Sequence, residues 1–287
     1  MKVAMLCLTV TGVLLIGSLV GAQEALVLYD NFEAKTLDSA KWFGGQSTDT
    51  GMVTLEMSRL IKNETLLGSK ALSLSNRSYA RTDTDSGHST ASTRIFFRDG
   101  SDIRTIEATV LVKKIVVSEC SANPYAAEAR VRIGGAFFNI GTPSSGDSTN
   151  DVWGQITVGR AFDSEDPAGT LHVYAKVYRC TDETCSTTAW VGSPDPQDLG
   201  TVKLNKKVKL RVTWDPSSNQ FIFQKGNGLE FLVSYVLNDD NPPGGLNGGM
   251  KRLEIQNFLP NCTGEPRPVG YIDASFDNIK VNESAVP

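Results

Sequence analysis

The 287-residue sequence carries 28 basic and 32 acidic residues, a formal net charge of −4 at pH 7. This balance gives no electrostatic reason to expect nucleic acid or an anionic membrane as a partner. The chain is long enough to bury a full core, and all-β folds often run to about 200–250 residues as one domain.

The first residues have the pattern of an export signal. Lys2 is followed by an apolar run that has no charged residue before Glu24. A basic start, an apolar core and a small-residue cleavage site are typical of a secretory signal peptide. We predict a signal peptide over 1–22, cleaved after Ala22, and a single domain over 23–287 in a secreted or periplasmic protein. An uncleaved anchor is the alternative, because the run approaches the roughly 17–25 residues of a spanning helix.

Short runs rich in Val, Ile, Thr and aromatic residues predict β-strands, because their apolar and polar residues alternate. In chain order the clearest runs are 105–112, 128–133, 171–178 and 207–214. Turn-forming residues separate such runs at 144–151, 163–169, 215–219 and 239–249. Many strands without a long amphipathic helix predict an all-β sandwich or jelly roll of antiparallel sheets.

The chain beyond the signal contains four cysteines, Cys120, Cys180, Cys185 and Cys262. An even number in an exported chain indicates two disulfides, with three possible connectivities. Cys180 and Cys185 bracket the turn-like TDET, which favours their pairing and leaves Cys120 for Cys262. The alternative, a metal site, is disfavoured because neither of the two histidines has the required spacing from a cysteine pair.

Three segments carry a family resemblance: LYDNFEAKTLDSAKW at 28–42, LRVTWDPSSNQFIFQKGNG at 210–228 and IDASFDNIKV at 272–281. They resemble strands of the concanavalin A-like lectin/glucanase superfamily, which includes laminin G-like domains. The resemblance implies a jelly roll of two antiparallel sheets with the first and last strands side by side. It does not identify a ligand.

The same superfamily contains glycoside hydrolases of family sixteen. Their two catalytic carboxyl groups stand on one strand as Glu-x-Asp-x-x-Glu, since retaining hydrolysis needs them about 5–5.5 Å apart. No such spacing occurs in this sequence, and the nearest acidic cluster, Asp163, Glu165 and Asp166, lies in a turn beside Pro167. We therefore expect no hydrolase of this type.

A second resemblance points to a lyase. The segments GQIT and VYAKVY are similar to segments of the family-seven polysaccharide lyases. The likeness implies that Gln155 neutralises a uronate carboxylate and that Tyr178 moves the proton, helped by Arg130 or Arg132. Thr157 replaces the histidine of that family, so a carbohydrate-active lyase is the alternative function and not the leading one.

The polar sides of three neighbouring runs suggest a binding surface. If 127–134, 152–160 and 170–178 pair as a meander, their aromatic, Arg, Lys and Gln side chains share one face. Such a face suits sugar rings and their hydroxyl or carboxylate groups, although ordinary exposed sheets use the same residue types. We predict non-catalytic binding of a polysaccharide or glycoconjugate, with a protein-binding structural or adhesion module as a further alternative. The predicted ligand-binding residues are Arg130, Arg132, Trp153, Gln155, His172, Tyr174, Lys176 and Tyr178.

Two aspartates near the ends are candidate calcium ligands. Many relatives of this superfamily bind Ca²⁺ through carboxylate and carbonyl oxygens. If the first and last strands are neighbours, Asp30 and Asp277 can approach one ion. The alternative is that both carboxylates accept hydrogen bonds from turn or bulge backbone.

The last strand changes phase. Residues before Phe276 alternate regularly, but Ile279 and Val281 are one position out of step. One face of a sandwich strand must stay on the core, so we predict a β-bulge at Asp277 and Asn278 that keeps Phe276, Ile279 and Val281 buried.

Overall fold

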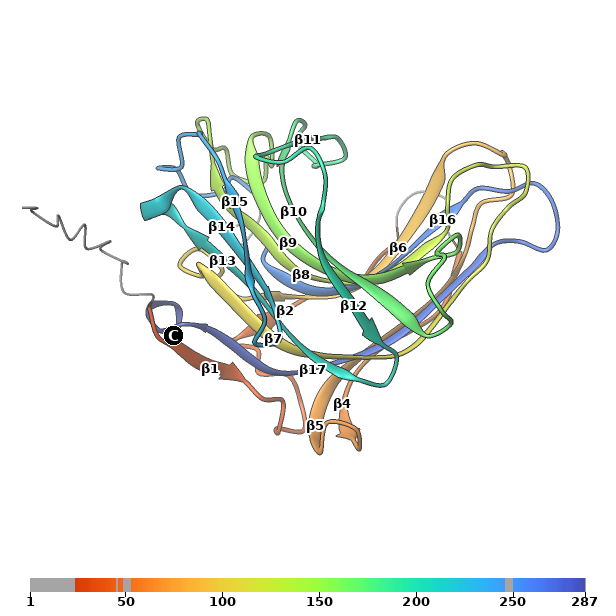
Figure 1. Cartoon of the computed structure of the whole chain (residues 1–287), viewed down its shortest axis with the longest axis horizontal. Helices are drawn as coiled ribbons and strands as arrows, with labels where there is room; N and C mark the ends of the chain where they lie inside the picture. Colours follow the sequence, from red (N-terminus) through yellow and green to blue (C-terminus); the bar gives the residue numbers. More distant parts are fainter. Residues whose placement is uncertain (1–23, 45, 49–52, 246–249, 287) are drawn as a thin grey trace, which may run out of the picture.

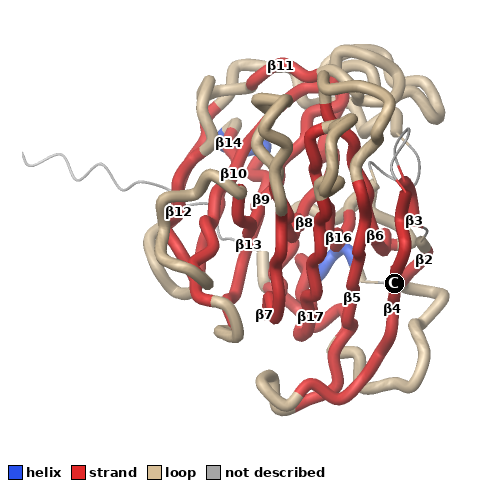
Figure 2. The backbone as a smooth tube through the Cα atoms, turned by 90° about the vertical axis from the view of Figure 1, so that its right-hand side faces the viewer, coloured by secondary structure: helices blue, strands red, loops and turns tan. Residues whose placement is uncertain are grey.

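A computed structural model describes residues 24–44, 46–48, 53–245 and 250–286. The predicted signal peptide, 1–22, lies outside the described residues. Nearly all regular structure is β, and two antiparallel sheets pack face to face (Figure 1, Figure 2). The chain therefore has the predicted all-β jelly-roll sandwich of two antiparallel sheets. No helix of the described residues is long and apolar enough to cross a membrane.

One sheet has eight strands among the described residues. Its first and last strands in the chain, β1 and β17, are paired, and β17 lies between β7 and β5. The strands, in spatial order, are β15 (Glu230–Ser234), β14 (Gln220–Lys225), β13 (Lys207–Asp215), β7 (Thr105–Val117), β17 (Val269–Asn282), β5 (Ser69–Tyr79) and β4 (Val53–Glu64), with β1 (Leu26–Asp30) on β17.

The other sheet has nine described strands, and three of them form the predicted meander. In spatial order they are β11 (Thr188–Trp190), β10 (Thr170–Cys180), β9 (Asp151–Ala161), β8 (Glu128–Asn139), β16 (Arg252–Pro260), β6 (His88–Phe97) and β2 (Trp42–Phe43), with β12 (Gln197–Lys203) on β10 and β3 (Gln46–Thr48) on β6. Two short 3₁₀ turns, η1 (Pro216–Ser218) and η2 (Glu283–Ala285), complete the described elements.

The core lies between the sheets and follows the sequence alternation. In β10 the inward residues Leu171, Val173, Ala175 and Val177 are all buried, while the residues between them point away from the core. Burying one such side chain stabilises the fold by roughly 1.5–3 kcal/mol. The period of two therefore decides which side chains are left for the outer face.

The bulge in β17 is where the sequence predicted it. The pairing with β7 advances by three residues on β17, from Asp277 to Lys280, against two on β7, and Asn278 has a φ of 50°. Phe276, Ile279 and Val281 are all fully buried. Because the extra residue is absorbed here, the strand keeps its apolar side on the core beside β1 (Figure 1).

Both predicted disulfides are present. Cys180 and Cys185 join the end of β10 to the turn before β11, and Cys120 is bonded to Cys262 across 142 residues of chain. The strands of the nine-stranded sheet are strongly curved, and the loops at the two ends of its strands rise as two lobes (Figure 1). The two disulfides fasten loops at these two ends.

Candidate functional site

The eight residues predicted to bind a ligand lie on the outer face of the nine-stranded sheet. Gly159 of β9 is opposite both Arg130 of β8 and His172 of β10, and Thr157 is opposite Arg132 and Tyr174. One step further, Gln155 pairs with Lys176 and Trp153 with Tyr178. Residues opposite each other in a ladder point to the same side. The meander therefore brings all eight together.

Burial separates these eight residues into two groups. His172 is exposed, and five others are partly exposed, whereas Trp153 and Gln155 are each only 2% exposed. The Arg252 guanidinium lies over the Trp153 ring at 4.7 Å, and the Tyr178 ring stacks on it at 6.0 Å. Trp153 and Gln155 therefore support the residues above them, and a ligand on this face would meet the others.

A hydrogen-bonded network links side chains of β10, β8 and β16 and passes over β9, which lies between β10 and β8. The Tyr174 hydroxyl donates to Glu128 Oε1 at 2.8 Å, and Arg130 Nη1 donates to Glu128 Oε2 at 2.7 Å. The same guanidinium donates through Nε and Nη2 to Gln256 Oε1, at 2.9 and 2.6 Å. Gly159 permits this crossing, since a Cβ at that position would lie 2.8 Å from Arg130 Cβ.

Next to this network, a buried carboxylate is held by arginines. Arg132 Nη2 and Arg252 Nε donate to Glu254 Oε2 at 2.8 and 2.7 Å, and Arg94 Nη1 lies 4.0 Å from Glu254 Oε1. Burial opposes ionisation of Glu254, but the arginines outweigh it and hold its pKa far below its usual range. Glu254 is thus ionised and anchors three cations on the face.

Cationic side chains gather in the middle of the face, around Glu254. Burial lowers the pKa of Lys176 to about 8, and repulsion from Arg130 and Arg132 adds to this effect. Burial also lowers the pKa of Arg132, against the attraction of Glu254, and its Nε has no hydrogen-bond partner among the described residues. Five cationic side chains lie near Glu128 and Glu254, while the groove is also lined by the carboxylates of Glu165, Asp166 and Asp198; the cations are Arg94, Arg130, Arg132, Arg252 and Lys176.

A groove of about 870 Å³ opens on this face beside the network. Trp190 of β11, 47% exposed, forms part of its lining together with Tyr174 and Lys176. Lys176 Nζ lies 6.0 Å from the Trp190 ring centroid. The groove therefore offers aromatic rings and charged groups to the same ligand.

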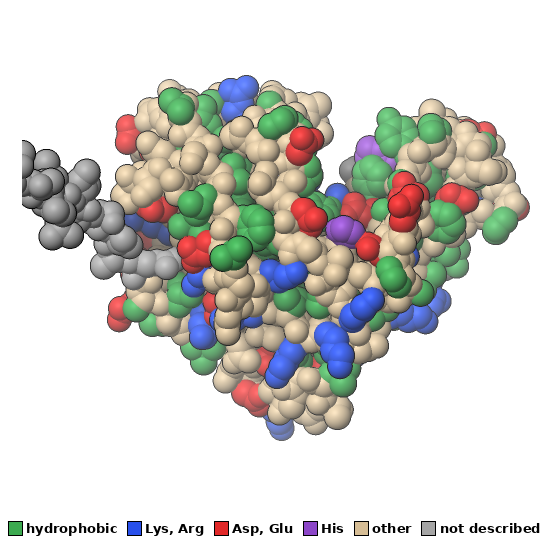
Figure 3. All heavy atoms as spheres, in the orientation of Figure 1, with side chains coloured by type: hydrophobic (Ala, Val, Ile, Leu, Met, Phe, Trp, Pro, Cys, Tyr) green, Lys and Arg blue, Asp and Glu red, His purple; other side chains and the backbone are tan. Residues whose placement is uncertain are grey.

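The rim of the groove is acidic and is shaped by the loop after β9. His172 Nε2 lies 2.6 Å from Asp166 Oδ2, and Nδ1 lies 4.0 Å from Asp198 Oδ1. Arg160 braces this loop by donating to the backbone oxygens of Asp166 and Thr170 at 2.9 Å. Figure 3 shows this face from outside as a notch between two lobes, with acidic and histidine side chains along it. The notch is the whole hollow between the lobes, and the groove is the part of it beside Trp190.

Several residues of the face were missed by the sequence analysis. Arg252, Glu254, Gln256 and Phe258 alternate along β16 and all point outward. The alternation was visible in RLEIQNFLP, but β16 is more than 90 residues from β9 in the chain. No single-sequence pattern indicates that it pairs with β8.

The aspartates predicted to bind calcium are held by hydrogen-bond donors. Asp30 accepts from the Phe32 backbone N–H at 2.8 Å and from Trp42 Nε1 at 2.6 Å. Asp277 accepts from Ser69 Oγ and from the backbone and side chain of Asn278. All four carboxylate oxygens accept hydrogen bonds, which is the arrangement that the alternative to a calcium site expects.

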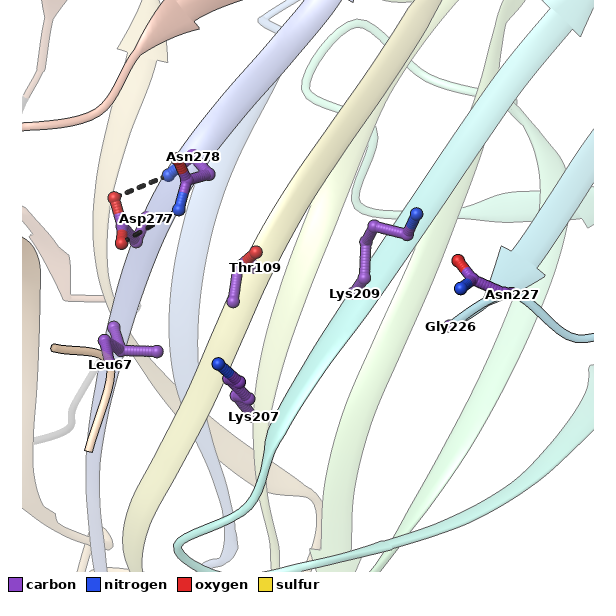
Figure 4. A pocket seen from close by; sticks show the side chains of 8 residues that line it. All are labelled: Leu67, Thr109, Lys207, Lys209, Gly226, Asn227, Asp277 and Asn278. Carbon is purple, nitrogen blue, oxygen red and sulfur yellow. Dashed lines mark hydrogen bonds between the residues drawn. The ribbon is translucent and has the colours of Figure 1, made fainter. Parts of the chain in front are cut away.

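Asp277 also lines a smaller hollow of about 370 Å³ on the outer face of the eight-stranded sheet. Figure 4 shows Asp277 turned toward Asn278, with Thr109, Lys207 and Lys209 across the hollow. None of its lining residues is aromatic. The notch is therefore the better candidate for a ligand that needs stacking.

Comparisons with known proteins give distant likenesses only. No protein-family model and no curated protein matches the chain. Among solved structures, an alginate lyase from Klebsiella pneumoniae is 14% identical, with a TM-score of 0.37 over 79% of this chain and 84% of that one. A beta-1,3-glucanase from Mycobacterium marinum is 12% identical, with a TM-score of 0.32 over 86% and 96%.

A lectin from Bauhinia forficata, solved in complex with GalNAc, is also 12% identical, with a TM-score of 0.25 over 89% of this chain and 98% of that chain. These proteins share the concanavalin A-like type of fold, but likenesses this weak assign neither a family nor an activity.

Proposed function

We propose that the protein is an exported, non-catalytic carbohydrate-binding protein that holds an acidic polysaccharide or glycoconjugate in the notch. The observation that carries the proposal is the groove in which Trp190, Tyr174 and Lys176 meet. Aromatic faces pack on the C–H faces of sugar rings, and cations pair with carboxylate or sulfate groups. Lys176 and its cationic neighbours Arg130 and Arg132 favour an acidic ligand over a neutral one at this part of the face.

Export is supported by the two disulfides, since such bonds persist mainly in oxidising compartments. The N-terminal pattern around Lys2 agrees with this compartment. Calcium binding by Asp30 and Asp277 stays a prediction, and the carboxylates of both residues accept hydrogen bonds in this structure.

A lyase is the second candidate, and one arrangement favours it. Tyr178 lies 3.2 Å from Gln155, as the family-seven likeness implies, and Lys176 Nζ is 5.5 Å from the Tyr178 ring centroid. A lysine with a pKa of about 8 can accept a proton. Against this, burial raises the pKa of Tyr178 and keeps its phenol protonated, and Thr157 stands in place of the histidine.

The test is a glycan array that contains neutral, uronate-rich and sulfated polysaccharides. We expect binding to acidic members that weakens as salt is added, because screening reduces attraction between exposed charges. Trp190→Ala should weaken binding about tenfold, the effect of one lost aromatic contact of about 1.4 kcal/mol. The control is Leu232→Ala, which removes a similarly exposed side chain from the other sheet.

The same samples decide between binding and lysis. A lyase creates unsaturated uronate, which absorbs ultraviolet light, so absorbance should stay flat if the protein only binds. Rising absorbance that disappears in Lys176→Ala would favour the lyase. Failure of every glycan to bind, with protein captured instead, would favour an adhesion module.

A further inference from the structure

A second aromatic cluster lies on the notch face, apart from the groove. His88, the first residue of β6, stacks on Phe258 of β16 with ring centroids 3.9 Å apart and an interplanar angle of 26°. The ring of Tyr125, from the loop before β8, is 5.7 Å from that of His88. His88 is exposed, and Tyr125 is 50% exposed. We call these three residues the loop platform.

The loop platform shares its face with the groove. Phe258 is opposite Glu128 in the ladder between β16 and β8, so both side chains point outward. His88 is paired with Pro260, two positions from Phe258, and therefore lies on the same side. Glu128 is also a lining residue of the groove, which makes the two sites neighbours on one surface.

Direct contacts connect the loop platform to the groove. The Arg130 guanidinium lies 5.8 Å from the Phe258 ring centroid, and its Nη1 is 3.5 Å from the Tyr174 hydroxyl. From Tyr174 the surface continues along β10 to Lys176, beside Trp190. The stretch of β10 from His172 to Tyr178 alone covers about 20 Å, which is room for several sugar rings.

The loops that carry the platform are fastened to one another. Asn123 Nδ2 donates to the backbone oxygens of Gly87 and Asn261 at 2.8 Å, and Asn123 Oδ1 accepts from the Tyr125 backbone N–H at 3.1 Å. Cys120, three residues before Asn123, is bonded to Cys262. Because these loops are held in place before binding, a ligand does not have to order them.

We propose that the loop platform is a second glycan subsite, so that the protein binds an extended polysaccharide chain lying across the notch. This rests on the proposed function and adds the length and course of the ligand. The surface between the platform and Trp190 is polar, with Arg130, Glu128 and Tyr174 in it. An apolar peptide would need a continuous apolar strip there. A sugar chain offers ring faces at intervals and hydroxyl or carboxylate groups between them, which matches this sequence of aromatic and polar contacts.

The experiment measures how affinity depends on chain length. The probes are disaccharide and octasaccharide fragments of polygalacturonate and of heparin, titrated against the whole protein by calorimetry. We expect Tyr125→Ala and His88→Ala each to weaken octasaccharide binding about five- to tenfold, as expected for one lost aromatic contact. The disaccharide, which cannot reach both sites, should bind these variants as it binds the unchanged protein. Tyr125→Phe, which keeps the ring, should restore octasaccharide binding.

Different results overturn the two proposals. If the octasaccharide loses affinity in Trp190→Ala but not in Tyr125→Ala or His88→Ala, the second subsite is wrong and glycan binding in the groove stands. Equal losses for both lengths in Tyr125→Ala also overturn it. If the unchanged protein binds neither length of either polymer, the proposed function and the subsite fall together.

Discussion

The two ends of the notch present aromatic rings in different ways. Trp190 stands on the hairpin of β10 and β11, a local unit closed by Cys180 and Cys185 only five residues apart. His88, Tyr125 and Phe258 come from three distant parts of the chain, and Cys120 and Cys262, across 142 residues, fasten the loops beside them.

The two ends of the notch obtain their rigidity from different contacts. Backbone pairing holds the hairpin, because Tyr178 is opposite Trp190 and Val191 N–H donates to the Val177 oxygen at 3.1 Å. Side chains and a disulfide hold the loop platform, because its segments come from distant parts of the chain. Substitutions that remove contacts between distant segments should therefore affect the loop platform more than the hairpin.

The largest expected effect tests this difference directly. In the chain-entropy account, replacing Cys120 and Cys262 by Ser costs about 5 kcal/mol of folding free energy, and replacing Cys180 and Cys185 costs about 2 kcal/mol, since a longer loop gains more freedom. Urea unfolding of both double variants measures the two values. A larger loss of unfolding free energy on replacing Cys180 and Cys185 would contradict this difference between the two disulfides.

The stability of the outer face between the two ends of the notch depends on the buried carboxylate of Glu254. Glu254→Gln removes the carboxylate that faces Arg94, Arg132 and Arg252, and breaking such a buried ion pair costs about 3–5 kcal/mol. The matched control is Glu107→Gln in the other sheet. Glu107 lies 3.7–3.8 Å from two partly exposed lysines, so about 1 kcal/mol or less is expected.

Acid titration checks the same charge without a substitution. The pKa of Glu254 in the folded protein lies far below its ordinary value of 4.5, so its contribution to stability is complete above about pH 4.5. As the pH falls below that value toward the folded pKa, the unfolded state takes up a proton more readily and this stability is lost. Glu254→Gln should therefore flatten the pH dependence of unfolding below pH 4.5. An unchanged slope would show that the stability depends on other carboxylates.

Local patterns were sufficient to predict the two-sheet sandwich, the bulge in β17 and the local disulfide of the hairpin. Alternation placed the inward residues of β10, and the phase slip after Phe276 located the bulge at Asp277. The close spacing of Cys180 and Cys185 indicated their bond. Each of these features depends on neighbours within a few residues, which is why one sequence contains the information.

The rest of the site depends on contacts between distant segments. Alternation placed Trp153 on the outer face, but it cannot show that Arg252, almost 100 residues later, covers the ring. In the same way no pattern near Tyr125 indicates that it will lie beside His88. The side of the sheet on which a residue lies is a local property, whereas its accessibility is decided by tertiary packing.

The smallest effect that we expect is a pH dependence of glycan affinity at the hairpin end of the notch, beside Trp190. Lys176 lies beside Trp190, with Arg130, Arg132 and Glu128 as its charged neighbours, and its pKa is about 8. Below that pH it is a cation that attracts an acidic glycan, and above it the charge is lost. Affinity for an acidic disaccharide should therefore fall a few-fold between pH 7 and pH 9, a range in which Tyr174, with a pKa of about 12, stays neutral. Lys176→Arg keeps the charge and should remove the dependence, which calorimetry at three pH values can measure. If the fall persists in Lys176→Arg, a group other than Lys176 is titrating, and the hairpin end does not owe its attraction for acidic sugars to this lysine.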